Sequence, residues 1–338
     1  MKTLMIYGAT GYTGRMAAEY AKASGLDLIV AGRSEAALAA LASELGGDYR
    51  VFGVDDGVGV DAALSGISVL LNCAGPYLRT AKPLMKAAIR NGVDYLDIAA
   101  ELDSYRLAEV LDVKAKAAGV MLLPGSGGSV AMLGCLAGHA TERVAEPKLI
   151  RIALHVTGSM SRGSAVSATE NMTGDCLRLI GGSLVGRRPE ELRDFDFGTG
   201  PKSCFPVTLP DLLTIHRATN VPDIETFVHV SGDAFPQGDL SVLPDGPTAQ
   251  QRESNRYQAA VEVTGADGSV VREVLDTVNG YTFTPMAAAE VARRVLAGER
   301  TPGFQTPAGL FGNGFAETIA DTRIANAGDF ISPVEHAS

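Results

Sequence analysis

The chain has 338 residues, 46% of them hydrophobic and 20% charged, which is enough for about two domains with sizeable apolar cores. Its net charge of −10 argues against a surface for nucleic acid or for anionic membranes. The four cysteines lie far apart and form no C-x-x-C pair, which fits a reduced cytoplasmic protein without disulfides or structural zinc. They are Cys73, Cys135, Cys176 and Cys204.

Neither a secretory signal nor a membrane span is expected. The first apolar run is interrupted at Gly8, which is too early for a signal peptide. The longest uncharged stretch, residues 120–140, is long enough to cross a bilayer, but Pro124 and several glycines interrupt it. We therefore expect a buried strand, loop and helix there, in a soluble protein that does not insert into membranes.

Up to residue 124 the sequence alternates strand and helix patterns with short connections, which is typical of a parallel sheet with helices on both faces. The expected strands are Thr3–Tyr7, Leu26–Ala31, Tyr49–Val54, Val69–Cys73, Tyr95–Ile98 and Val120–Leu123. The expected helices are Gly14–Ser24, Glu35–Leu45, Val60–Leu64, Thr80–Asn91 and Ser104–Ala118. The prediction is an α/β, Rossmann-type doubly wound domain over residues 1–124.

The pattern changes beyond Pro124. A helix over Val130–Thr141 is followed by alternating apolar and polar residues, which predict strands. These strands are Leu149–Thr157, Thr226–Ser231, Arg256–Thr264 and Ser269–Asn279, the last two joined as a hairpin by Gly265–Gly268. They predict a mixed, largely antiparallel sheet in an inserted α+β domain over residues 125–284, with Arg272, Glu262 and His229 on a polar face.

Two further segments frame this domain. Residues 158–164 form a small-residue loop, after which a helical pattern runs through Leu179. A last helix, Pro285–Ala297, is ended by Gly298, and we expect residues 285–338 to return to the first domain.

A glycine-rich turn follows the apolar run Leu4–Ile6. Gly8, Gly11 and Gly14 recur at every third residue, and a helical pattern follows. Strand, glycine turn and helix in this order are the context of a dinucleotide-binding turn, where the glycines permit a tight turn, approach to the pyrophosphate and close helix packing. The alternative is an ordinary strand–helix junction.

The free N–H groups and dipole at the helix start bind negative charge, so we predict that Thr10, Tyr12 and Thr13 contact the cofactor with the glycines. The spacing G-x-x-G-x-x-G, with Ala9 after the first glycine, is common among reductases that use NADP.

The end of the second expected strand predicts which dinucleotide binds. An NAD site would carry Asp or Glu here to hold the ribose 2′-hydroxyl, but no acid occurs before Glu35. Arg33 instead offers a guanidinium for a 2′-phosphate, with Ser34 as a second donor. Asp55, after the third strand, is a candidate for the adenine amine. Solvated side chains are the alternative for Arg33 and Asp55.

Residues after the fourth and fifth strands lie at the carboxyl edge of the predicted sheet. Ala74 and Gly75 are expected to line the nicotinamide ribose. Tyr77 follows where substrate would bind, and its phenol can donate a proton. Glu101 is a second candidate acid, base or substrate contact. The alternative for Tyr77 is that it is a packed turn residue. For Asp97 the alternative is that it only caps or orients the loop.

The loop at 158–164 opens a helix and is a second candidate anion site, in which Arg162 and Ser164 would bind a substrate carboxylate. A flexible turn with a solvated arginine explains it equally.

His155 and His229 lie on expected strands and are interpreted as structural. No H-E-x-x-H, metal cluster or G-x-S-x-G is present, so no metal is expected. No tyrosine has lysine four residues on, which excludes the Tyr-x-x-x-Lys chemistry of short-chain reductases.

These motifs together resemble the saccharopine dehydrogenase-like oxidoreductases. The resemblance rests on Tyr-Gly-Ala-Thr-Gly-Tyr-Thr-Gly-Arg (7–15), Ala-Gly-Arg (31–33), Asn-Cys-Ala-Gly-Pro-Tyr (72–77) and Gly-Val-Asp-Tyr-Leu-Asp-Ile-Ala-Ala-Glu (92–101). Ser-Arg-Gly-Ser (161–164) and Thr-Pro-Ala-Gly (306–309) are similar to later landmarks of the family. The resemblance implies cofactor contacts at Gly8, Gly11, Gly14 and Arg33, an active-site edge at Tyr77 and Glu101, substrate bound between two domains, and homodimers built on the second sheet.

The chain departs from this family at residues 123–129, where no acid follows Pro124-Gly125, and this argues against an amino-acid substrate such as saccharopine. The hypothesis is an NADP(H)-dependent oxidoreductase acting on a C=N or activated C=C/C=O bond of a small molecule, with Tyr77 or Glu101 as proton donor. The alternative is a catalytically silent NADP-binding sensor or interaction protein.

Overall fold

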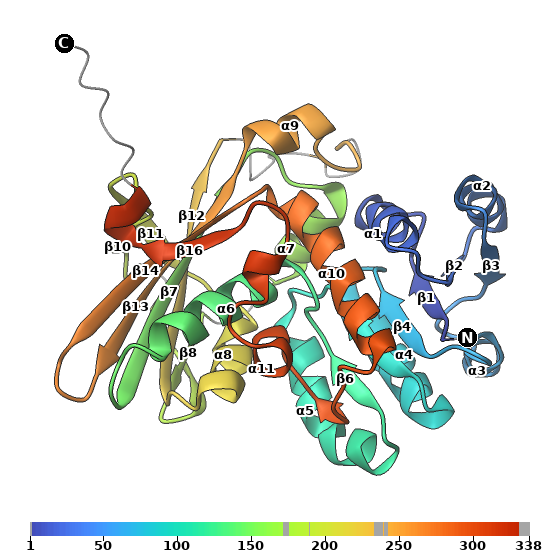
Figure 1. The fold of residues 1–338 in the computed structure, drawn as a ribbon, viewed down its shortest axis with the longest axis horizontal. Coiled ribbons are helices and arrows are strands. Elements are labelled where there is room, and N and C mark those ends of the chain that lie inside the picture. The colour runs from blue at the N-terminus through green and yellow to red at the C-terminus, as the bar shows by residue number, and fades with distance from the viewer. Residues whose placement is uncertain (1, 172–175, 189, 233–238, 240–242, 331–338) are drawn as a thin grey trace.

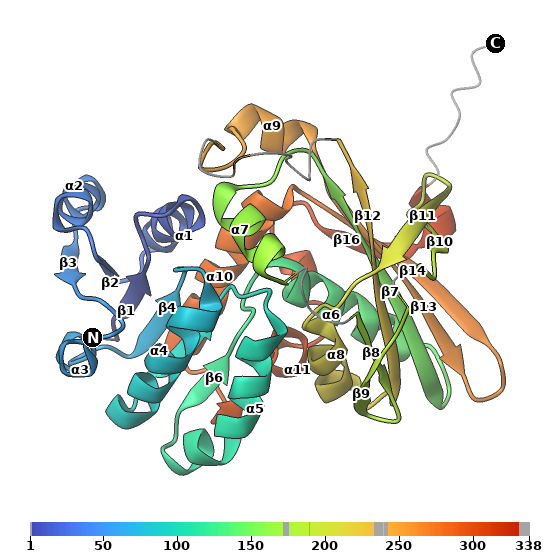
Figure 2. The same ribbon diagram turned by 180° about the vertical axis from the view of Figure 1, so that it is seen from behind.

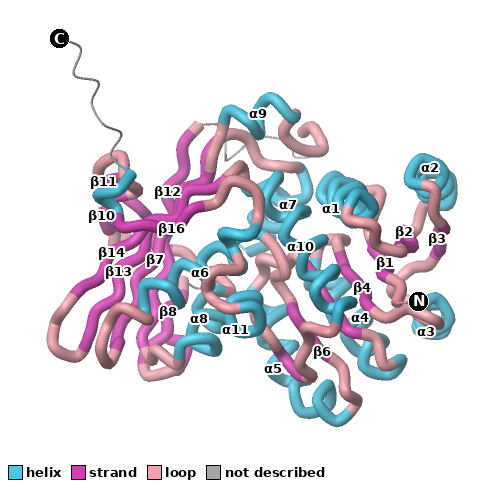
Figure 3. Tube along the Cα trace, viewed as in Figure 1, coloured by secondary structure: helices cyan, strands magenta, loops and turns pink. Residues whose placement is uncertain are grey.

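The computed structural model describes residues 2–171, 176–188, 190–232, 239 and 243–330. Its strands gather into two sheets, with helices between them and around the first (Figures 1 and 3). The fold class predicted from the sequence is confirmed: a parallel Rossmann-type sheet is joined to a second, mixed sheet. Within the described residues, no helix is both long enough and apolar enough to cross a membrane.

The first sheet has seven parallel strands in the order β15-β6-β5-β4-β1-β2-β3, the order of a doubly wound nucleotide-binding sheet extended by one strand. Its strands are β1 (Leu4–Tyr7), β2 (Leu28–Gly32), β3 (Asp48–Val51), β4 (Val69–Asn72), β5 (Asp94–Asp97), β6 (Met121–Leu123) and β15 (Gly303–Phe304). Strands β1 and β4 are buried along their whole length, because helices cover both faces of a parallel sheet.

Helices α1 (Tyr12–Ala23) and α10 (Gly280–Ala297) pack against each other on one face of this sheet. Helices α3 (Gly57–Ala63), α4 (Tyr77–Asn91) and α5 (Leu102–Ala117) follow one another on the other face, as the two opposite views show (Figures 1 and 2). Helix α2 (Glu35–Leu45) connects β2 to β3. Helices therefore cover both faces of the central strands, which leaves the ends of these strands for ligands.

The second sheet has nine strands, with the main path β10-β11-β12-β7-β13-β14-β16 and the hairpin β8–β9 attached to β12. Its strands are β7 (Pro147–Thr157), β8 (Leu177–Ile180), β9 (Ser183–Gly186), β10 (Arg193–Asp196), β11 (Pro201–Pro206), β12 (Asp223–Ser231), β13 (Tyr257–Gly265), β14 (Val270–Thr277) and β16 (Arg323–Asn326). Among the strands that the structure describes in this sheet, only β7 and β12 pair in parallel. The sheet is mixed and largely antiparallel, as the alternating sequence predicts.

The outer face of this sheet carries cross-strand rows. One row alternates charge: Glu225, Arg151, Glu262 and Arg272 lie in register on β12, β7, β13 and β14. The next row is apolar, with Phe227, Ala153, Ala260 and Val274 packed under residues of the β10–β11 segment. The polar face predicted around Arg272, Glu262 and His229 is thus divided by a small apolar core.

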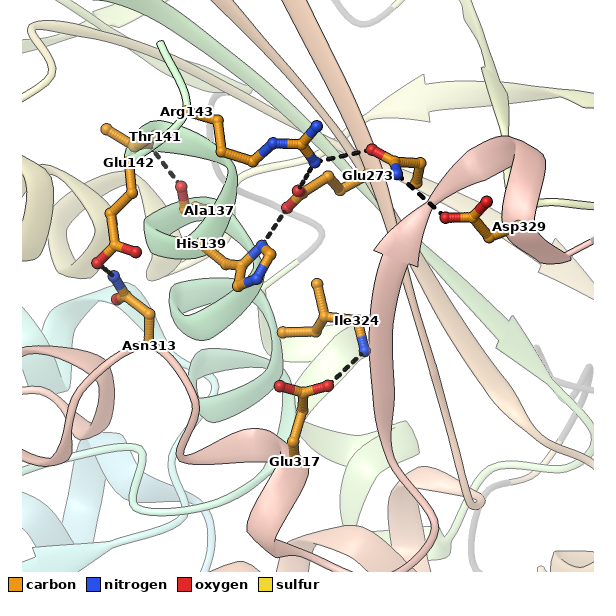
Figure 4. A network of polar contacts seen from close by, with 11 residues as sticks. Ala137, His139, Thr141, Glu142, Arg143, Glu273, Asn313, Glu317, Ile324 and Asp329 are labelled. Carbon is orange, nitrogen blue, oxygen red and sulfur yellow. Dashed lines mark hydrogen bonds and ion pairs between the residues drawn. The ribbon is translucent and has the colours of Figure 1, made fainter.

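Helix α6 (Gly128–Thr141) joins the two halves. Its residues are small or apolar on every side, and it packs against the second sheet, α8 (Asp211–Thr219), α10 and α11 (Pro307–Phe311). Figure 4 shows its carboxyl end, where the buried carboxylate of Glu273 in β14 pairs with His139, 2.7 Å away, and with Arg143. This network fixes the helix to the sheet.

The remaining helices are α7 (Arg162–Asn171) and α9 (Ala249–Ser254), with short 3₁₀ turns at Ala316–Thr318 and Ala327–Phe330. The prediction of a helix that runs through Leu179 is wrong for its second half. Helix α7 ends at Asn171, residues 172–175 lie outside the described part, and Leu177 and Leu179 belong to β8. In this segment apolar and polar side chains alternate at every second residue and Leu179 is buried, which is the pattern of a strand.

We expected residues 285–338 to return to the first domain. Helix α10 packs on α1, and β15 extends the parallel sheet beside β6. Strand β16, however, pairs with β14 at the edge of the second sheet. The segment therefore contributes to both halves of the molecule, and residues 331–338 lie outside the described part.

Candidate cofactor and active site

The glycine turn between β1 and α1 is a tight main-chain structure. Gly8 adopts φ +79°, and its N–H donates to the carbonyl of Ala31, 2.8 Å away. A Cβ on Gly8 would lie 2.8 Å from the main-chain nitrogen of Ala74, and a Cβ on Gly14 would collide with the carbonyl oxygen of Gly8. Both positions therefore require glycine, one for its conformation and both for close packing.

The start of α1 is open to an anion. Gly11 is the N-cap and offers no side chain, so the first N–H groups of the helix have no side-chain cap. Thr10 and Gly11 are exposed, and Tyr12 and Thr13 are partly buried. Unsatisfied N–H groups and the helix dipole form a cradle for the pyrophosphate of a dinucleotide. This geometry fits the cofactor that the glycine spacing predicts.

The residues predicted to select NADP gather around the hydroxyl of Tyr7. Burial raises the pKa of Tyr7, the charge of Arg33 lowers it and the charge of Asp55 raises it, so both groups lie near this ring. Arg33 and Ser34 are exposed, and Arg33 forms no ion pair or hydrogen bond with the described residues. A guanidinium without an acid partner beside the end of β2 is available for a phosphate.

The loop after β4 is held by a buried hydrogen-bond network. The amide of Asn72 donates to the hydroxyls of Thr80 and Tyr95, each 3.1 Å away, and accepts from the N–H of Ala74. Thr80 in turn donates to the carbonyl of Ala74 at 2.6 Å. The main chain at Ala74 is therefore fixed from both sides, next to the glycine turn.

Asp97, the last residue of β5, joins the loops that follow β5 and β6 at the carboxyl edge of the sheet. Its carboxylate accepts hydrogen bonds from the N–H groups of Ala99 and Gly125 and from the hydroxyl of Tyr95, at 2.9–3.0 Å. Complete burial raises its pKa to about 6, against these hydrogen bonds, which lower it. Its satisfied oxygens assign Asp97 to loop positioning, the role left open by the sequence.

Tyr77 and Glu101 begin neighbouring helices at this edge. Tyr77 is the first residue of α4 and is 8% exposed, and Glu101 is the N-cap of α5 and is 3% exposed. Burial raises the pKa of Tyr77 well above its usual value, and the charges of Asp97 and Glu101 add to this. The structure thus brings the two predicted catalytic residues into electrostatic contact, with Tyr77 protonated at neutral pH.

The loop at 158–164 is held against α10. Ser161 and Ser164 hydrogen-bond each other, and the N–H of Ser161 donates to the hydroxyl of Tyr281 in α10 at 2.8 Å. The side chain of Arg162 pairs with Asp245. Arg162 therefore has an acid partner in this structure, which a substrate carboxylate would have to replace.

Asp211, at the first position of α8, escaped the sequence reasoning. It is fully buried, and neither carboxylate oxygen has a hydrogen bond of normal geometry, although the Ser129 side chain lies near enough to lower its pKa. Burial is the larger effect and raises that pKa to about 7. The hydroxyl of Thr214, one turn along α8, is buried and unpaired as well. Nothing local in the sequence signals burial of this acid.

The histidines and cysteines carry no further chemistry in the described residues. His155 contacts Ser231 at 2.9 Å and Gln258, and His229 contacts the carbonyl of Ser203, which supports the structural interpretation. All four cysteines are free thiols. Among the residues that the structure places, no three His, Cys, Asp or Glu side chains are grouped as a metal site.

Comparison with known proteins identifies the first domain. Residues 4–123 match the family described as "Saccharopine dehydrogenase NADP binding domain". A trans-acting enoyl reductase of Mycobacterium tuberculosis is 33% identical over 106 residues, which are 29% of this chain and 25% of that protein. A saccharopine dehydrogenase-like oxidoreductase of Rattus norvegicus is 30% identical over 146 residues, 37% of this chain and 34% of that protein. The matches thus span about a quarter to a third of the length of these relatives.

A solved structure shares the whole fold. The apo saccharopine dehydrogenase (L-Glu forming) of Saccharomyces cerevisiae superposes with a TM-score of 0.66 over 96% of this chain and 100% of that chain, at 14% identity. The resemblance inferred from the sequence motifs is confirmed. Residues 4–123 are similar to the NADP-binding domain of saccharopine dehydrogenases, which supports a nicotinamide dinucleotide as the cofactor.

Proposed function

We propose that this protein is an NADP(H)-dependent oxidoreductase that transfers hydride to or from a C=N or activated C=C/C=O bond of a small molecule. The family of its first domain and the reductase names of its relatives support the reaction class. The observation that carries the proposal is that Tyr77 and Glu101 are both buried at the starts of α4 and α5, where the charge of Glu101 helps to raise the pKa of the phenol, beside the loop Ala74–Gly75 that lies against Gly8 of the glycine turn.

The chain's own residues would divide the work as follows. The glycine turn holds the pyrophosphate through main-chain N–H groups, and Arg33 with Ser34 holds the 2′-phosphate. Ala74 and Gly75 line the nicotinamide ribose on a loop held by Asn72 and Thr80, and Asp97 keeps the neighbouring loops at Ala99 and Gly125 in place. Bound NADPH supplies the hydride.

Tyr77 is the better proton donor of the two candidates. Its raised pKa keeps the phenol protonated at neutral pH, and its hydroxyl has no hydrogen-bond partner among the described residues. The free O–H can therefore donate to an oxygen or nitrogen on which negative charge develops. Glu101 accepts from the N–H of Ala100 and contributes negative charge near this phenol.

The two substrate classes differ in the charge of the product. Reduction of C=N yields an amine, whereas enoyl reduction leaves a neutral C–C bond. The relatives named trans-acting enoyl reductases support the second class. The name of the rat relative and of the yeast structure supports the first. Both belong in the test.

The test is NADPH oxidation measured against imines, 2-oxo acids with amines, and enoyl thioesters. We expect turnover with one class, and a loss of at least about tenfold in kcat for Tyr77→Phe and Glu101→Gln, with NADPH affinity unchanged. Tight NADPH binding without turnover of any class would favour the silent sensor instead.

The second sheet supports a homodimer as part of the same proposal. Several of the exposed large apolar side chains lie on its strands and connections: Ile180, Val185, Leu192, Phe205 and Val270. Exposed apolar side chains favour burial in an interface, and an interface between identical chains is self-complementary. Sedimentation equilibrium should give twice the chain mass of 35.1 kDa, and a charge at Leu192 should shift it toward the monomer.

A further inference from the structure

Tyr12 in the glycine turn is touched by a segment from the other half of the molecule. We name this segment, residues Asp245–Arg252, the strap. The hydroxyl of Tyr12 donates to the carbonyl of Pro247 and accepts from the guanidinium of Arg252, 2.7 Å away. Gly246 lies against the ring, since a Cβ there would be 2.5 Å from it. The strap therefore rests on the first residue of α1.

The strap is fixed at both ends. Asp245 pairs with Arg162 at the start of α7, and Thr248 caps α9 in a reciprocal pair with Gln251. Tyr281 of α10 accepts a hydrogen bond from the N–H of Ser161 and packs edge-on against Tyr12, with ring centroids 5.8 Å apart. Tyr12 is thus contacted by the strap on one side and by Tyr281 on the other, and these contacts fix the position of Arg252.

Arg252 has no acid partner among the described residues. One nitrogen, Nη1, donates to Tyr12 and to the carbonyl of Pro247, at 2.7 and 2.9 Å, and its other donors have no partner in the described chain. Nearby arginines are neutralised, Arg162 by Asp245 and Arg256 by Asp276 and Asp321. A partly buried guanidinium without an anion, held on the residue that opens α1, favours binding of a negatively charged ligand at that helix end.

We propose that Arg252 binds the pyrophosphate of NADP(H) from the strap, and that Tyr12 positions it, so that the cofactor site is completed by the second half of the chain. The main-chain N–H groups of the turn would contact one side of the pyrophosphate and the guanidinium the other. This assignment rests on the cofactor site alone and is independent of the redox step of the proposed function.

The test is equilibrium binding of two probes to the full chain. NADPH contains the pyrophosphate, whereas adenosine 2′-monophosphate contains the 2′-phosphate and no pyrophosphate. The chain has no tryptophan, so NADPH fluorescence reports binding directly, and the second probe is measured by displacement. Arg252→Ala should weaken NADPH about tenfold or more and leave adenosine 2′-monophosphate unchanged. Arg252→Lys should recover part of the loss.

Arg293→Ala, which removes an exposed charge from α10, is the control and should change neither affinity. Thermal unfolding of the apo variants separates a folding defect from a binding defect. The proposal is overturned if Arg252→Ala binds NADPH within twofold of the parent, or if both probes weaken equally.

The positioning role of Tyr12 has its own readout. Tyr12→Phe removes the hydroxyl that holds Arg252 and keeps the ring on which Gly246 and Tyr281 pack. It should weaken NADPH by about threefold in the parent and by nothing further in Arg252→Ala, because the two side chains act as a unit. An undiminished loss in the Arg252→Ala background would show that Tyr12 does not act through Arg252.

Discussion

The two ends of the candidate site are built in different ways. At the glycine turn, seven consecutive residues place main-chain groups by the absence of side chains at Gly8 and Gly14. At the Asp97 edge, side chains from the ends of the neighbouring strands β4 and β5 meet in a hydrogen-bond network that includes Asn72, Tyr95 and Asp97. The first end depends on backbone shape and the second on buried polar partners, so different substitutions should damage each.

Gly14→Ala should have the largest effect. The new methyl group would collide with the carbonyl oxygen of Gly8, and neither the turn nor α1 can move without disturbing the other. We expect a loss of about 3 kcal/mol in the free energy of unfolding and of about hundredfold in NADPH affinity. Gly25→Ala, at a turn with open space around it, is the steric control, and its positive φ makes it slightly destabilising. Unchanged NADPH affinity in Gly14→Ala would refute the main-chain account of this end.

Asp97→Ala should have the next largest effect and tests the other end. It leaves the buried N–H groups of Ala99 and Gly125 without their acceptor, at a cost of roughly 2–3 kcal/mol. Asp97→Asn is the matched control, since both N–H groups donate to Oδ1, which the amide retains. Denaturant unfolding should rank Asp97→Ala well below Asp97→Asn, and similar stabilities would contradict the positioning role.

This contrast explains how much could be predicted from the sequence. The glycine turn was predicted because its residues are contiguous in the sequence, and because each glycine is required by the local geometry of the turn and helix. Tyr77 and Glu101 were located because residues after parallel strands meet at one edge. Their electrostatic contact and the network behind them depend on tertiary packing, for which the sequence holds no local sign.

Two residues on elements distant in the sequence were missed for the same reason. Arg252 lies on a short helix among polar residues, and Asp211 follows a proline at a helix start, where acids are common on protein surfaces. The strands between Leu177 and Pro206 were also missed, because they are short and interrupted by charges, glycines and prolines. In each case burial, and not local pattern, determines the role.

Asp211→Asn should change stability in the opposite direction: at neutral and alkaline pH it should raise the free energy of unfolding. Burial raises the pKa of Asp211 to about 7, from an ordinary value of 3.8, so the folded state holds a proton that the unfolded state releases. The stability from this group is present below about pH 4 and is lost as pH rises toward 7 and beyond. Unlike Asp97, its oxygens lack hydrogen bonds of normal geometry.

The asparagine variant removes this proton uptake without changing the size of the side chain. We expect its free energy of unfolding to equal that of the parent near pH 4 and to exceed that of the parent at pH 8. Urea unfolding at both pH values measures this difference. A parent whose stability does not fall relative to the variant between these values would show that Asp211 ionises freely in the folded protein.

Arg33→Ala should have the smallest effect on affinity, and this effect should be specific to NADPH, because Arg33 is expected to bind a single phosphate. Arg33 is exposed and unpaired among the described residues, so its removal should leave the free energy of unfolding unchanged. NADPH should bind about tenfold more weakly, the usual worth of one charge-assisted contact, while NADH affinity stays constant. Arg15→Ala on α1 is the matched control, since Arg15 is also exposed but already paired with Glu19 and Glu44. If NADPH and NADH weaken together in Arg33→Ala, the arginine supports the adenosine end in general, and the 2′-phosphate is recognised by another group.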